Sequence, residues 1–161
     1  MYEHEITVNK FLLGGLDAVL ADIPNERVYD RAPGNGHQPI WVLGHLAICA
    51  ELGHSLLGQP IAHEQWLPKF GPGSPDEVAP DAAWAPADLI TATHTGYARL
   101  QELAANADAS ALDRPHGIDL LDGTPIENVG QLVSHLLSSH FSFHLAQLSG
   151  WRRAAGHGPL F

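Results

Sequence analysis

The sequence predicts an all-α protein built as a single four-helix bundle over residues 1–161. Four segments carry apolar residues at helical spacing, and capping residues mark several of their ends. The chain is long enough for one domain, and 45% hydrophobic with 16% charged residues is typical of globular proteins. The stretch 58–85 is much longer than a usual bundle turn and contains five prolines. Such a long crossover between the second and third helices would join parallel neighbours, so a simple up-down-up-down bundle is not expected.

The first two helices are predicted from their apolar stripes and end signals. The first is expected over about 2–22, where Pro24 closes the segment. The second is expected over about 39–57, with Pro39 in its first turn and Gly58 as its C-terminal cap. The stripe of the first consists of Val8, Leu12, Leu16, Val19 and Ile23. The stripe of the second consists of Trp41, Val42, His45, Ile48, Cys49, Leu52 and Leu56.

The last two helices are predicted in the same way. The third is expected over about 86–107, with Tyr97 beside its apolar face. The fourth is expected to begin with Thr124 as N-cap and Glu127 three residues later, the pattern of a capping box, and to end near 155. Its inward stripe consists of Val129, Val133, Leu136, Leu137, Leu148 and Trp151.

The composition excludes several classes of protein. With 18 acidic and 8 basic residues, the formal charge of −10 argues against binding to nucleic acid or to an anionic membrane surface. Cys49 is the single cysteine, so no internal disulfide can form. Neither a signal peptide nor an apolar stretch long enough to span a bilayer is apparent, so a cytoplasmic location is expected.

The 11 histidines include a pair, His140 and His144, spaced so that both rings lie on one face of a helix. The pair alone is weak, because composition predicts about 0.7 such pairs by chance. Both residues, however, lie within the apolar stripe of the fourth helix, and His45 lies at the centre of the second helix's stripe. Inward imidazoles need partners, either neighbouring polar groups and water or a metal ion. Three of them, two at ligand spacing, favour a divalent metal.

The other eight histidines are interpreted as solvated residues. His54 is placed opposite His45 on the second helix, while His135 and His94 are placed on outer helix faces. The rest are near ends or in loops: His4, His37, His63, His116 and His157.

Three segments resemble the DinB-like family of four-helix proteins. Residues 41–47 read WVLGHLA and are similar to the family's second-helix motif. Residues 140–148 read HFSFHLAQL and resemble its last-helix HxxxHxxQ motif, and residues 151–156 read WRRAAG, like the tail that follows it. The order and separation of these motifs are more specific than any one of them.

The resemblance implies an up-down-down-up bundle, often dimeric, that binds zinc, nickel or iron through His45, His140 and His144. Relatives include thiol S-transferases that use low-molecular-weight thiols. A homodimer is therefore expected, and apolar residues placed off the inner stripe of the last helix, Phe141 and Leu145, agree with it.

Three protein ligands leave a coordination position open, where water or a thiol can bind. No carboxylate lies on the predicted inward stripes near the histidines, which favours thiol transfer over metal-assisted hydrolysis. The hypotheses are thus a thiol S-transferase acting on a small molecule, a metal-dependent hydrolase, or a non-catalytic metal-binding or dimerisation module.

Three further residues are candidates for the site. Cys49 follows His45 by one turn and is either a fourth ligand, a nucleophile or a small buried apolar residue. Gln147 is either a residue that orients a ligand or a packing residue, and Tyr97 either offers its hydroxyl to a substrate or packs in the core.

Overall fold

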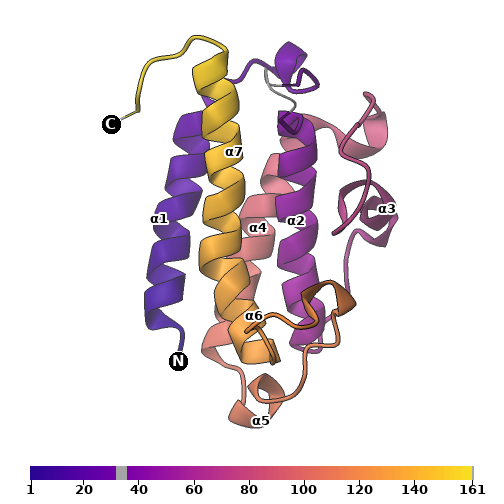
Figure 1. Ribbon diagram of the computed structural model, residues 1–161, viewed down its shortest axis with the longest axis vertical. Coiled ribbons are helices and arrows are strands. Elements are labelled where there is room, and N and C mark those ends of the chain that lie inside the picture. Colours follow the sequence, from indigo (N-terminus) through magenta and orange to yellow (C-terminus); the bar gives the residue numbers. More distant parts are fainter. Residues whose placement is uncertain (32–35, 161) are drawn as a thin grey trace.

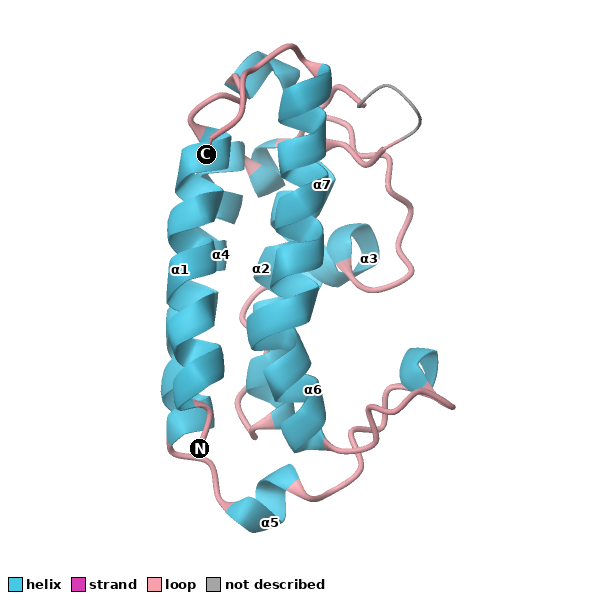
Figure 2. Ribbon diagram, turned by 60° about the vertical axis from the view of Figure 1, so that its left-hand side comes forward, coloured by secondary structure: helices cyan, strands magenta, loops and turns pink. Residues whose placement is uncertain are grey.

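The computed structural model describes residues 1–31 and 36–160, and the regular elements within them are helices. The predicted all-α class is confirmed; in this part of the chain the one β feature is an isolated bridge between Pro115 and Asn128. Long helices lie side by side along one axis (Figures 1 and 2). They are α1 (Glu3–Leu20), α2 (Pro39–Leu56), α4 (Pro86–Ala105) and a last helix comprising α6 (Val129–His135), a π-helical turn (Leu136–His140) and α7 (Phe141–Ala154).

Short helical elements fill the connections. The crossover between α2 and α4 contains α3 (Leu67–Phe70) and two 3₁₀ turns, Glu64–Trp66 and Ala82–Trp84. The connection before the last helix contains α5 (Ala109–Leu112) and the 3₁₀ turn Asp119–Leu121, and a further 3₁₀ turn, Asn25–Arg27, follows α1.

Helix α2 is the most buried element. It packs against α4, α7 and α3, and nearly all of its residues are buried, as its almost continuously apolar sequence requires. His54 is therefore buried as well, and its Nε2 donates to the carbonyl of Gly96 at 2.8 Å. The prediction of a solvated His54 is wrong, because the face opposite His45 is covered by α4.

The crossover is held against α2 by a buried carboxylate and a buried ring. Glu51 accepts hydrogen bonds from the backbone of Ala62 and His63 and from His63 Nδ1, the last at 2.5 Å. Phe70 is fully buried against Gly44, where any Cβ would come within 2.3 Å of the ring. The glycine therefore brings the crossover close to the helix that carries His45.

Two predicted details of the helices are wrong. On α1 the residue facing the core is Asn9, while Val8 is 44% exposed. The last helix begins at Val129 rather than near Thr124, because Asn128 is the N-cap and forms a capping box with Gln131.

The π-turn changes which residues of the last helix face inward. A π-helical turn contains one more residue than an α-helical turn, so the inward stripe moves on by one position. Phe141 consequently lies in the core, fully buried and edge-on to Tyr97 with ring centroids 4.8 Å apart. The expectation that Phe141 lies off the inner stripe, available to a dimer partner, is wrong for this reason.

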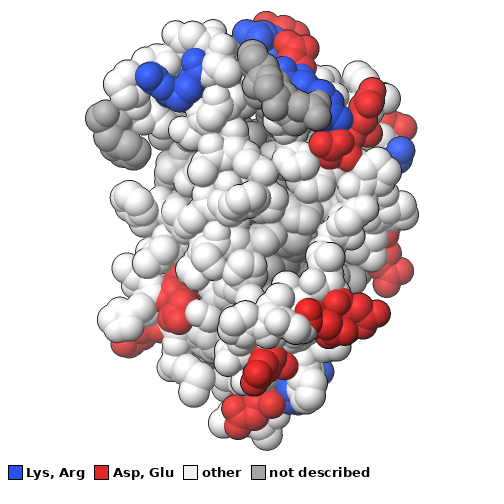
Figure 3. All heavy atoms as spheres, viewed as in Figure 1, with Lys and Arg blue, Asp and Glu red and all other residues white. Residues whose placement is uncertain are grey.

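Charged side chains on the face shown in Figure 3 gather towards its two ends and leave its middle without charge. None of the helices in the described ranges is both long and apolar enough to cross a membrane.

Candidate metal centre

His45 is held in one orientation by the crossover. Its Nδ1 lies 2.7 Å from the carbonyl oxygen of Phe70, and the side chain is only 5% exposed. A carbonyl oxygen can only accept, so Nδ1 carries the hydrogen and Nε2 presents a lone pair. This is the tautomer in which a histidine binds a metal through Nε2 while a backbone carbonyl orients its ring.

His140 brings the last helix to this lone pair. Its Nε2 lies 3.2 Å from Nε2 of His45, although the two residues are 95 positions apart. Its Nδ1 is buried and has no hydrogen-bond partner among the described residues. A metal held between the two rings would bind Nε2 of His140 and leave the hydrogen on Nδ1.

His144 completes a triangle of rings. Its Nδ1 lies 2.7 Å from Oε1 of Gln147, which leaves Nε2 free to bind a metal. The ring centroids are separated by 5.2 Å for His45–His140 and by 4.6 Å for both pairs that include His144. A tetrahedral metal with bonds of about 2.1 Å to three ring nitrogens would separate the centroids by about 5.2 Å. The His144 ring therefore lies close to the other two rings, whereas the ligand atoms that gather within 4.8 Å of one another belong to His45, Cys49 and His140.

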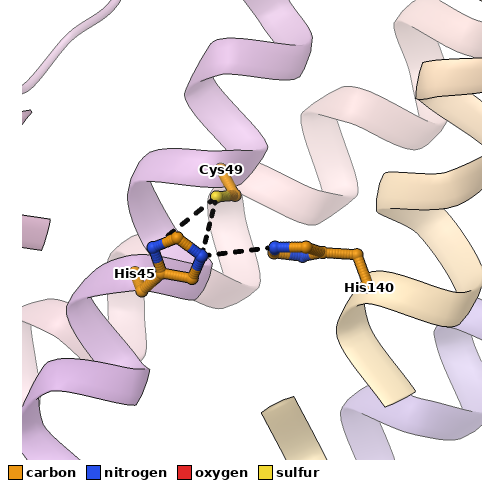
Figure 4. A group of neighbouring side chains, drawn as sticks. All are labelled: His45, Cys49 and His140. Carbon is orange, nitrogen blue, oxygen red and sulfur yellow. Dashed lines mark hydrogen bonds between the residues drawn. The ribbon is translucent and has the colours of Figure 1, made fainter. Parts of the chain in front are cut away.

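Cys49 is part of the same cluster (Figure 4). Its Sγ lies 3.4 Å from Nε2 of His45, and the ligand atoms of His45, Cys49 and His140 all lie within 4.8 Å of one another. Burial raises the pKa of the thiol to about 12, so the sulfur is protonated unless a cation displaces the proton. We call His45, Cys49, His140 and His144 the cluster. His45 and His140 are its shared candidate ligands, and either His144 or Cys49 could be the third.

The histidines of the cluster are neutral. Burial is the main cause of a lowered pKa at each: His45 is shifted down, His140 falls to about 2 and His144 to about 4, with the neighbouring rings adding to the shift. Neutral imidazole is the form that binds metals, so protons do not compete for these nitrogens near pH 7.

This burial predicts acid destabilisation of the metal-free protein. Above pH 6.5 these imidazoles are neutral in both states, and below it the unfolded chain binds protons that the folded chain does not. Stability should therefore fall between pH 6.5 and about 4, with each buried histidine contributing up to about 1.4 kcal/mol per pH unit. Urea denaturation of chelator-treated protein at several pH values measures this, and His140→Gln should make the slope shallower. Equal stability at pH 7 and pH 5 would contradict it.

An apolar cavity of about 280 Å³ adjoins the cluster. His45, Cys49 and His140 line it together with side chains of α2, the last helix and both long connections. Its apolar lining includes Trp41, Leu52, Leu56, Ile118, Leu121 and Leu136. Within the described ranges, no Lys, Arg, Asp or Glu lines it. The site can therefore hold an uncharged molecule next to the candidate ligands.

The other candidate residues lie at different distances from the cavity. Gln147 contacts His144 directly, as described above. Tyr97 is fully buried in the core, where burial raises its pKa well above the usual value, and it is not among the residues found to line the cavity.

Sequence reasoning missed the positions of His135 and His37 near the cluster and the stacking of Trp41 between two histidines. His135 lines the cavity with its ring centroid 5.5 Å from that of His140, so the prediction of an outer-face residue is wrong. The π-turn accounts for this, because it rotates α6 relative to α7. Trp41 stacks on the His45 ring at 4.7 Å, and His37 stacks on the other face of Trp41 at 4.3 Å. His37, Trp41 and His45 are four residues apart in the sequence. This spacing places neighbouring rings on one face of a helix, so it could have predicted the stack.

The fold and the cluster define a helical protein with a histidine and cysteine site that fits a divalent metal. Comparison with known families agrees: the profile of the DinB superfamily matches residues 13–148, a range that includes every residue of the cluster. The chain therefore belongs to the DinB superfamily, a metal-binding family. No curated protein and no solved structure gave a significant match.

Proposed function

We propose that this chain is a metal-dependent enzyme that transfers a low-molecular-weight thiol to a small, uncharged electrophile. The observation that carries the proposal is the position of the cluster, which lies at the wall of an apolar cavity that no described charged side chain lines. In the reaction the thiol sulfur forms a bond to carbon, the thiol proton is released, and the leaving group departs with its bonding electron pair.

The ligands proposed for the metal are His45, His140 and His144, with zinc, nickel or iron as the ion. A bound divalent metal supplies Lewis-acid chemistry and lowers the pKa of a coordinated thiol or water. The protein's own contribution is to keep the three rings neutral and oriented, with Phe70 and Gln147 as hydrogen-bond partners of His45 and His144. Cys49 is proposed to be a buried thiol beside the site, because it is fully enclosed by the core and buried free cysteines usually act as small apolar residues.

A metal-dependent hydrolase is the second candidate. Hydrolysis of this kind usually needs a general base close to the reacting water. His135 is a half-buried residue of the cavity wall that could fill this role, with its Nδ1 2.7 Å from Ser139 Oγ. A non-catalytic metal-binding module is the third candidate, and the cavity beside the cluster favours an enzyme over it.

The experiment is turnover of a panel of uncharged alkylating and epoxide electrophiles by metal-loaded protein. We expect product only when a low-molecular-weight thiol is added, and loss of product in His140→Ala, while His135→Gln retains thiol-dependent turnover. Turnover without thiol that disappears in His135→Gln would support the hydrolase instead. Metal binding with no turnover of any substrate would support the module.

The arrangement of the chain is part of the same proposal. The course of the helices in Figure 1 supports up-down-down-up order, with α2 and α4 parallel and joined by the crossover.

We also propose a homodimer formed through α1 and α7. A cavity between these helices includes Gly15, Ala18, Leu145 and Phe11, and Phe11 is 72% exposed. Light scattering that gives the monomer mass at micromolar concentration would contradict the dimer.

A further inference from the structure

The π-turn in the last helix determines where His140 points. In an α-helix each residue turns the chain by about 100° around the helix axis. One inserted residue therefore rotates the side chains of α6 relative to those of α7 by about 100°. Without the insertion, the inward position that follows Val133 and Leu136 would be His140 itself. With it, Phe141 fills that core position and His140 lies at the edge of the inward face, where it meets His45.

A π-turn also leaves one backbone carbonyl without its helical donor. N–H groups inside the turn bond to the carbonyl five residues back, and the return to four-residue spacing skips one acceptor. Leu137 lies within the turn, and its carbonyl accepts a hydrogen bond of 2.8 Å from Nδ2 of Asn9 on α1. Asn9 is fully buried, and α1 packs directly against the π-turn.

Gln101 on α4 fixes the orientation of the Asn9 amide. Its Nε2 donates to Oδ1 of Asn9 at 2.8 Å, so the NH₂ group of Asn9 must face the Leu137 carbonyl. Both side chains are buried, and together with the Leu137 carbonyl they link α4, α1 and the last helix. A buried polar pair is costly unless its hydrogen-bonding groups are satisfied, and here the amide of Asn9 is satisfied by Gln101 on one side and by the Leu137 carbonyl on the other.

We infer that Asn9, oriented by Gln101, is a positioning residue that stabilises the π-turn and thereby directs His140 towards His45. The inference rests on the proposed metal centre for its functional meaning, but not for its geometry. Asn9 touches neither the cavity nor the ligands and acts only through the backbone of the last helix.

The first test is structural and uses metal-free protein. Asn9→Asp, studied at alkaline pH where its carboxyl is ionised, keeps the shape and the acceptor for Gln101 but sets an oxygen against the Leu137 carbonyl. Asn9→Leu removes both bonds at any pH. We expect crystal structures of these variants to lack the π-turn, with the two Nε2 atoms of His45 and His140 no longer within hydrogen-bond distance. If the variants fail to crystallise folded, Gln101→Leu perturbs the same bond more mildly and should shift His140 in the same direction. An unchanged π-turn and an unchanged His45–His140 contact would overturn the inference.

The second test is metal affinity, measured by competition for Co²⁺ against a chelator, with the visible absorption of Co²⁺ as the report on coordination. We expect Asn9→Asp to weaken binding about tenfold or more and to change the spectrum, as loss of an orienting contact does at other metal sites. Leu16→Ala is the matched control, because it removes a fully buried side chain two turns further along α1. It should lower the melting temperature without changing affinity or spectrum.

An equal loss of affinity in Leu16→Ala and Asn9→Asp would overturn the inference, since it would reduce Asn9 to a general stabiliser. If the unaltered protein bound no metal, the proposed function would fail, whereas the metal-free structures would still decide the role of Asn9.

Discussion

His45→Ala is expected to abolish stoichiometric metal binding in chelator-washed, reloaded protein, and His144→Ala is expected to do the same. Each variant leaves ligands that cannot close a three-histidine site across α2 and the last helix. Because the unfolded chain has no assembled site, metal should raise the melting temperature of the unaltered protein and not that of the variants. Elemental analysis and thermal melts with and without added metal measure both effects.

His54→Ala is the matched control, because His54 is also a buried histidine of α2 but lies on the opposite face and donates to Gly96. It should lower stability through the lost hydrogen bond and still bind one metal per chain. One metal bound to His45→Ala with unchanged affinity would show that the site does not span the two helices.

Gly44→Ala is expected to have the second largest effect, although residue 44 carries no functional group. A Cβ at this position would lie 2.3 to 2.6 Å from three atoms of the Phe70 ring, which is fully buried and cannot move aside. The crossover must then shift away from α2, and the Phe70 carbonyl moves off Nδ1 of His45. We expect a loss of about 1–3 kcal/mol in the free energy of unfolding. Metal affinity should fall about 10–100-fold, as calorimetric titration can show.

The double variant Gly44→Ala with Phe70→Leu tests the cause. The smaller side chain makes room for the new methyl group, while the backbone carbonyl of residue 70 is retained. Metal affinity should recover in the double variant more than stability does, because the Leu side chain fills the site less well than Phe. No recovery would mean that the contact between Gly44 and Phe70 does not act through His45.

Much of the fold could be predicted because it follows from periodicity and caps. The apolar stripes predicted α2 and α4, Pro39 predicted the start of α2, and the prolines predicted the crossover. Each of these features is local, and together they indicate an all-α chain. The start of the last helix was misplaced because two capping patterns, at Thr124 and at Asn128, compete over four residues. Asn128 is the N-cap because Gln131 forms a reciprocal capping box with it.

The candidate ligands could be found from phase alone, since His45, His140 and His144 lie near apolar stripes of two helices. The sequence could not predict the contact between those helices. An apolar stripe shows which face of a helix is buried but not which other helix packs against that face. The approach of Cys49 Sγ to His45 and the orientation of His45 by the Phe70 carbonyl both depend on tertiary packing.

The π-turn is the main feature that sequence patterns missed. The residues 136–140, LLSSH, fit a regular α-helix, and a single inserted residue leaves no periodic signal in so short a window. Its consequences extend to Phe141, His135 and Asn9, whose burial was predicted wrongly or not at all. The burial of Asn9 is itself known only from the structure, because the sequence placed Val8 on the inward stripe.

A crystal structure of the metal-loaded protein, with anomalous diffraction data collected at the metal's absorption edge, would locate the ion relative to the three histidines. We predict one anomalous peak per chain, within about 2.0–2.3 Å of Nε2 of His45, His140 and His144, the usual range for bonds from histidine to such metals. A peak bound by His45, Cys49 and His140 without His144 would correct the ligand set. A peak remote from His45, or no peak in protein loaded with excess metal, would show that α2 and the last helix do not together hold a divalent ion.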